Sequence, residues 1–156
     1  MQAIDRQTVT NAAAQRYHAG TRSTFLVMPH QTNNALAVVE MSLAQGAEPP
    51  RHVHTREDET FLVHEGELQM SLGDETFVLG PGMSAFLPRG IEHAFRLLTP
   101  TARLTVMITP GKFANFFWNS SVEVSHDLPP APQGPPPVGV IEKMVADLVG
   151  YGVFFV

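Results

Sequence analysis

Three histidines and one glutamate are spaced in a way that could hold a metal ion. His52 and His54 are separated by one residue, so on a β-strand both imidazoles project from the same face. Glu59 differs in parity from His54, so the polar segment between them must bend or loop and deliver Glu59 from the next strand. His93 follows a Pro-x-Gly turn that could bring a third imidazole to the pair. Imidazole nitrogen and carboxylate oxygen suit one divalent ion of Fe, Ni, Mn, Co or Zn, and four protein ligands leave two positions free on an octahedral ion.

The two segments that carry these residues resemble the paired motifs of the cupin superfamily. Residues 46–66, GAEPPRHVHTREDETFLVHEG, fit G-x5-H-x-H-x4-E-x6-G at every fixed position. Residues 82–97, GMSAFLPRGIEHAFRL, fit G-x5-P-x-G-x2-H-x3-N through His93 but have Leu97 where the family usually has Asn. That Asn is not a metal ligand, so its absence leaves the metal set intact. The runs PPRHVHTREDETF and PGKFANFF are also similar to small bacterial proteins related to quercetin 2,3-dioxygenase.

The resemblance implies an all-β jelly-roll barrel, the double-stranded β-helix of single-domain cupins. It implies that His52, His54, Glu59 and His93 bind one divalent metal ion per subunit, and that the chain forms a homodimer. Fold resemblance does not set the reaction, because cupins include dioxygenases, isomerases, decarboxylases, sugar-binding regulators and storage proteins. We expect a metal-dependent dioxygenase for a small aromatic or enolic substrate, with Glu59 as the catalytic carboxylate. A non-redox metal-dependent isomerase or hydrolase and a non-catalytic ligand-binding module are the alternatives.

Other polar residues near the motifs compete for these roles. Glu57 and Asp58 are rival carboxylates, but Glu59 has the better motif spacing and leads directly into an apolar strand. His64 has the opposite parity to Glu59 and should point away from the site, and the histidines at 18, 30 and 126 lie outside both motifs. Three arginines could orient an anionic group or simply face solvent: Arg51, Arg56 and Arg89.

Parity also predicts the walls of a substrate pocket. Phe61 and Val63 should share the inner face with Glu59, and Phe95 and Leu97 should share it with His93. Three methionines with directions that the sequence leaves open complete the predicted pocket: Met41, Met70 and Met107. Such a mainly apolar cavity suits an aromatic or otherwise hydrophobic substrate better than a sugar nucleotide.

Short alternating runs separated by glycine and proline turns predict the strands that position the site. The predicted strands are Ser23–Met28, Ala35–Leu43, Arg51–His54, Thr60–His64, Glu67–Leu72, Thr76–Leu79, Ser84–Leu87, His93–Leu98 and Arg103–Ile108. Outside this barrel core of about 23–110, residues 111–118 carry phenylalanines at helical spacing and the proline-rich run 128–137 is expected to be an extended connector. A C-terminal helix is predicted over residues 138–150. Thr8–Tyr17 fits either a helical turn or an arm.

Composition limits the remaining possibilities. A chain of 156 residues suits one domain, here 1–156, and the absence of cysteine excludes thiolate ligands and disulfides. The net charge of -5, with scattered lysines and arginines, argues against a nucleic-acid partner and leaves a small molecule as the expected one. No apolar run reaches the roughly 20 residues of a membrane helix. The N-terminus has no secretory pattern, so a cytoplasmic location is expected.

Overall fold

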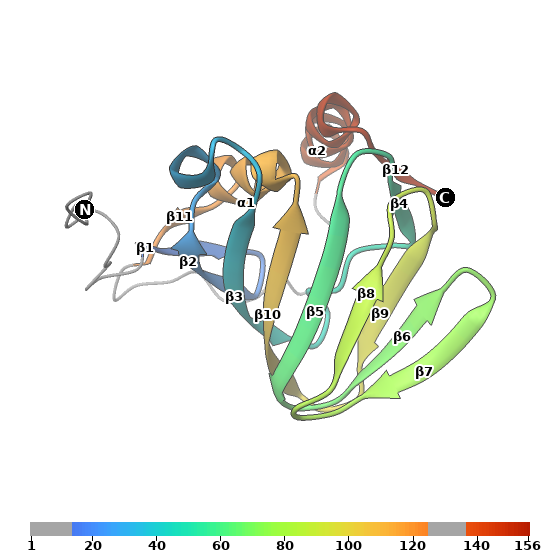
Figure 1. Cartoon of the computed structure of the whole chain (residues 1–156). Helices are drawn as coiled ribbons and strands as arrows, with labels where there is room; N and C mark the ends of the chain where they lie inside the picture. Colours follow the sequence, from blue (N-terminus) through green and yellow to red (C-terminus); the bar gives the residue numbers. More distant parts are fainter. Residues whose placement is uncertain (1–13, 125–136) are drawn as a thin grey trace.

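The computed structural model describes residues 14–124 and 137–156, which form two facing antiparallel sheets with helices α1 and α2 at one end (Figure 1). The seven-stranded sheet has the order β11 (Val122–Glu123), β1 (Ala14–His18), β2 (Thr21–Val27), β3 (Ala37–Ala44), β10 (Thr101–Thr109), β5 (Asp58–Glu65) and β8 (Ser84–Leu87). The five-stranded sheet has the order β12 (Val153–Phe155), β4 (His52–His54), β9 (His93–Leu97), β6 (Leu68–Leu72) and β7 (Glu75–Leu79). This is the predicted all-β jelly roll.

The core lies between the two sheets because apolar residues alternate along their strands. In β3 and β10 every second residue is buried, and register pairs Val39 with Val106 and Met41 with Leu104. The five-stranded sheet supplies Leu68 and Met70 from β6, both without exposed surface. Burial of these alternating side chains is the main force that holds the sheets face to face.

The nine strands predicted from the sequence are confirmed, and each predicted end lies within two residues of the observed one. Within the described residues, three further strands were not predicted: β1, β11 and β12. The segment Thr8–Tyr17 resolves in part, since its residues from Ala14 onward belong to β1 and the earlier ones lie outside the described residues.

Helical structure covers one end of the barrel. A 3-10 turn (Gly111–Phe113) runs into α1 (Ala114–Asn119), so the phenylalanine-rich segment is helical. The predicted terminal helix is confirmed as α2 (Val138–Tyr151), and Gly152 ends it with a φ of 85°, a conformation that favours glycine. The proline-rich connector, up to residue 136, lies outside the described residues.

The C-terminal segment returns to the barrel after α2. Strand β12 pairs with β4, so that Val153 lies opposite His54 and Phe155 lies opposite His52. The Thr55 backbone amide and hydroxyl both donate to the Gly152 carbonyl, at 2.9 and 2.8 Å. The strand with two candidate ligands is therefore paired on both sides. Among the described residues, no helix combines the length and apolar character that a membrane crossing requires.

Candidate metal centre

The structure brings the four predicted ligand residues together between the two sheets. His52 and His54 come from β4, and His93, the first residue of β9, lies opposite His52 in the ladder. Glu59 comes from β5 in the other sheet, so the bend that its parity required is a change of sheet. One ligand atom from each residue lies within 4.8 Å of the others, and all four residues are buried.

The Glu59 carboxylate faces two of the imidazoles. Its Oε2 lies 3.4 Å from His93 Nε2 and 3.6 Å from His54 Nε2. The ring centroids of His52 and His93 are 4.5 Å apart, and those of His52 and His54 are 5.1 Å apart. Nitrogen and oxygen lone pairs therefore converge on one small volume.

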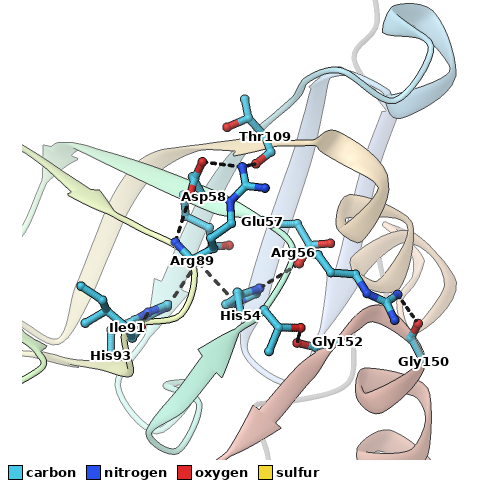
Figure 2. Close-up of polar contacts among 12 residues, drawn as sticks. His54, Arg56, Glu57, Asp58, Arg89, Ile91, His93, Thr109, Gly150 and Gly152 are labelled. Carbon is cyan, nitrogen blue, oxygen red and sulfur yellow. Dashed lines mark hydrogen bonds and ion pairs between the residues drawn. The ribbon is translucent and has the colours of Figure 1, made fainter.

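The opposite ring nitrogens contact the protein. His52 Nδ1 lies 2.9 Å from the Pro50 carbonyl oxygen, and His93 Nδ1 lies 3.3 Å from the Ile91 carbonyl oxygen. His54 Nδ1 instead faces a carboxylate, with Glu57 Oε2 at 3.5 Å (Figure 2). The two carbonyl contacts orient the rings of His52 and His93 so that their Nε2 atoms are available to an ion.

A buried nitrogen atom without a hydrogen-bond partner also fits a metal ion at this position. Buried polar groups in proteins nearly always have partners. His93 Nε2, however, is buried and has no hydrogen-bond partner among the described residues, although it points at the cluster. A divalent ion at the cluster would coordinate this nitrogen, so the donor set can hold one metal ion.

Burial and mutual charge shift the pKa values within the cluster. Burial, reinforced by the nearby His93, lowers the pKa of His52 from 6.5 to about 4. Burial also opposes the charged forms of His54 and Glu59, but several nearby groups together outweigh it. Glu59 and Glu57 raise the pKa of His54, and the histidines, His54 first, lower the pKa of Glu59. Glu59 is therefore a carboxylate at neutral pH, and His52 is a neutral imidazole.

The two rival carboxylates have other contacts. Asp58 accepts hydrogen bonds from the Arg89 backbone amide at 2.8 Å and from its guanidinium at 3.0 and 2.6 Å (Figure 2). These bonds lower the pKa of Asp58 to about 2 and fasten the start of β5 to the turn before β9. Glu57 lies beside His54 and outside the four-residue cluster. The structure thus favours Glu59 as the carboxylate of the site.

The other histidines among the described residues lie outside the cluster, as the sequence predicted. His64 contacts the Thr105 hydroxyl at 2.7 Å on the outer side of β5 and β10. His18 contacts the Ser120 carbonyl, and His30 is exposed in a 3-10 turn. His126 lies outside the described residues.

Two of the candidate arginines also contact the protein itself rather than the cluster. Arg51 donates to Glu92 at 2.7 Å, and Arg56 donates to the Gly150 carbonyl at 3.0 Å. Arg89 binds Asp58, so each of the three arginines contacts a protein group outside the four-residue cluster.

The predicted pocket residues divide into two groups. Five are buried in the barrel interior: Met41, Phe61, Val63, Met70 and Leu97. Phe95 is partly buried, and the centroid of its ring lies 5.8 Å from that of Phe61. Met107 differs, because its neighbours Val106 and Ile108 point inward and alternation turns Met107 to the outer face. The prediction that Met107 lines the pocket is therefore wrong, because its side chain lies on the outer face of the sheet.

Sequence reasoning missed two residues that contact His54. Glu57 was considered only as a rival ligand. Phe113 belongs to the segment with phenylalanines at helical spacing, but that spacing does not indicate its edge-on contact with His54, at a centroid distance of 4.7 Å. The aromatic spacing at 113, 116 and 117 was the visible signal, and the structure adds Tyr151 from α2 to the same aromatic group.

Comparison with known proteins gives a family match for the middle of the chain. Residues 39–109 match the model of the cupin domain. Two curated relatives are quercetin 2,3-dioxygenases: that of Bacillus subtilis (strain 168) is 29% identical over 104 residues, and that of Aspergillus japonicus is 32% identical over 72 residues. The matches cover 66% and 43% of this chain but only 31% and 21% of those relatives.

Solved structures support the same fold. An RmlC-like cupin from Shewanella frigidimarina NCIMB 400 has a TM-score of 0.60 and 23% identity, with 74% of this chain and 99% of that chain covered. KdgF from Halomonas sp. has a TM-score of 0.57 and 22% identity, with 65% and 91% covered. At this identity the likeness establishes the fold alone.

Proposed function

Residues 39–109 of this chain are a cupin domain, and we propose that it is a metal-dependent dioxygenase for a small aromatic or enolic compound. In this proposal His52, His54, Glu59 and His93 bind one divalent ion. The observation that carries it is the Glu59 carboxylate, buried beside two imidazole Nε2 atoms in a mainly apolar interior. The two quercetin 2,3-dioxygenases among its relatives support oxygen chemistry over the other reactions of the fold.

The residues divide the work between binding and proton transfer. When bound, a divalent ion supplies Lewis acidity and holds the reactants in alignment. His52 and His93 are held by carbonyl acceptors at their Nδ1 atoms, and Glu59, with its lowered pKa, is deprotonated at neutral pH. We propose that a Glu59 oxygen accepts the proton of the substrate's enolic or phenolic hydroxyl, which leaves an electron-rich oxyanion for reaction with dioxygen.

The interior favours an apolar substrate. Phe61, Val63 and Leu97 are buried in the barrel with the ligand residues, and Phe95 lies against Phe61. Among the described residues no lysine or arginine is buried, so beyond the metal centre the interior offers no positively charged side chain to a phosphate or carboxylate group of a substrate. A ring system with one acidic hydroxyl group matches this environment.

The primary experiment measures metal content and oxygen consumption. Protein purified without added metal is analysed for Fe, Ni, Mn, Co and Zn, and oxygen uptake is followed with a flavonol and simpler enols. Substoichiometric metal combined with failure to load any of these ions would contradict the metal site. Turnover that persists without oxygen and with Zn would replace the dioxygenase by the non-redox enzyme, and tight binding without turnover would indicate the ligand-binding module.

A variant pair tests the role of Glu59. Glu59→Gln keeps the size and one oxygen donor but removes the base, so we expect retained metal and turnover lowered about 10²- to 10⁴-fold. Glu65→Gln is the matched control, because Glu65 lies on the same strand, is exposed and contacts Arg103. Equal turnover in Glu59→Gln and the control at saturating metal would remove Glu59 from the mechanism.

The homodimer and the cytoplasmic location stay predictions.

A further inference from the structure

The three imidazoles of the candidate metal centre differ in the kind of group that their Nδ1 atoms face. In each, Nδ1 is directed at an acceptor of the protein. For His52 and His93 that acceptor is a backbone carbonyl two residues earlier in the chain, a local contact that any sequence could provide. For His54 it is a side chain, the carboxylate of Glu57. The orientation of His54 alone therefore depends on the identity of a second residue.

Glu57 is placed for this contact and has no other evident role. It stands between β4 and β5 in the polar segment that carries the chain from one sheet to the other. The residue is 4% exposed, and its Oε2 has no hydrogen-bond partner among the described residues. His54 Nδ1, 3.5 Å away, is likewise buried and without a hydrogen bond. A buried carboxylate without a partner is costly, so these two groups are each other's available partner.

We propose that Glu57 is a positioning residue that accepts the Nδ1–H of His54 and thereby keeps its Nε2 lone pair directed at the metal position. The contact fixes both the ring angle and the tautomer, because a proton held on Nδ1 leaves Nε2 free of hydrogen. The negative charge also makes the imidazole a stronger donor. This inference rests on metal binding at the four residues, which is part of the proposed function.

A purely structural role for Glu57 gives different expectations. If the carboxylate only filled space, an apolar side chain of similar length would be tolerated and would remove a desolvation cost. Glu57→Met is that replacement. Glu57→Gln is the conservative one, since its amide oxygen still accepts the Nδ1–H but carries no charge. The exposed carboxylate of β5 again supplies the control, Glu65→Gln.

The experiment uses Co²⁺ affinity and the histidine tautomer as separate readouts. Co²⁺ alone is titrated into metal-free full-length protein by calorimetry and absorption. Multiple-bond ¹H–¹⁵N spectra of the metal-free protein at about pH 9, where histidine is neutral, report which ring nitrogen of His54 carries the proton. We expect Nδ1–H in the wild type, in Glu57→Gln and in the control, and a shift toward Nε2–H in Glu57→Met. We expect Co²⁺ affinity to fall about 10- to 100-fold in Glu57→Met, and less in Glu57→Gln.

Each outcome decides the proposal. Wild-type Co²⁺ affinity in Glu57→Met with unchanged His54 tautomer would overturn it. If Glu57→Met does not fold, the wild-type tautomer decides, because the proposal requires Nδ1–H on His54 in the metal-free protein and Nε2–H there overturns it. If the wild type binds no Co²⁺, the proposed function fails instead, and the tautomer of the metal-free protein still shows whether Glu57 orients His54.

Discussion

Replacing Phe113 by alanine should weaken both the fold and the metal centre. Phe113 is 3% exposed, and its ring lies 4.7 Å from that of His54, 5.0 Å from Phe117 and 5.8 Å from Tyr151. The change removes a ring that joins the segment after β10, the terminal helix and a candidate ligand. Truncation of a buried phenylalanine costs about 3–5 kcal/mol of unfolding free energy. At about 2–4 °C per kcal/mol for a chain of this size, the melting temperature should fall by about 6–20 °C.

The effect of Phe113→Ala on metal affinity can be estimated separately from its effect on stability. An edge-on aromatic contact contributes about 0.5–1.5 kcal/mol beyond its buried area. If that contact orients His54, its loss weakens Co²⁺ binding about 2- to 10-fold, measured at a temperature where the variant is fully folded. Phe86→Ala is the control, since Phe86 is 59% exposed and its loss should change stability by no more than about 0.5 kcal/mol.

The two readouts can fail separately. A melting temperature within 2–3 °C of the wild type, about 1 kcal/mol, would refute the aromatic group as part of the core. Lowered stability with unchanged Co²⁺ affinity would keep the packing argument but remove Phe113 from the positioning of His54.

Further predictions concern metal, pH and backbone packing. With free metal at 100 times its dissociation constant, chelation should remove about 2.7 kcal/mol of stability and lower the melting temperature by about 5–11 °C, and an unchanged melting curve would argue against the site. Because the pKa of His54 is raised above 6.5, an ion must displace its proton, so affinity should weaken as pH falls from about 8 to 6. Calorimetry in buffers of different ionisation enthalpy should detect the released proton. Gly111→Ala would place a Cβ 2.4 Å from the Leu36 carbonyl carbon and should cost about 1–3 kcal/mol or more in denaturant titrations, whereas Gly80→Ala meets no atom within 4 Å and should be neutral.

The strands were predictable because their signals are local. Alternating apolar residues with glycine and proline turns between them determine both where a strand lies and which face is buried. The same rule could have fixed the direction of Met107, since Leu104, Val106 and Ile108 share one parity and leave Met107 on the other. The cluster of three histidines and Glu59 was predictable because two spaced motifs carry it, and one strand or one turn orients each histidine.

The contacts that sequence reasoning missed depend on tertiary neighbours. Strand β12 has three residues, too few for a readable alternation, and it pairs only because α2 ends at Gly152 beside β4. Glu57 precedes its strand, so parity says nothing about its direction. Its role became visible only when the turn between the sheets placed its carboxylate next to His54.

The metal centre draws its donors from both layers of the barrel, three imidazoles from one and a carboxylate from the other. An ion held there would act as a cross-link between the layers, much as a disulfide joins two segments distant in sequence. A local opening fluctuation that separates the two sheets would then have to break a coordination bond. Amide hydrogen exchange in β4, β5 and β9 should therefore slow together on metal loading, while exchange in the peripheral β1 and β11 should change little.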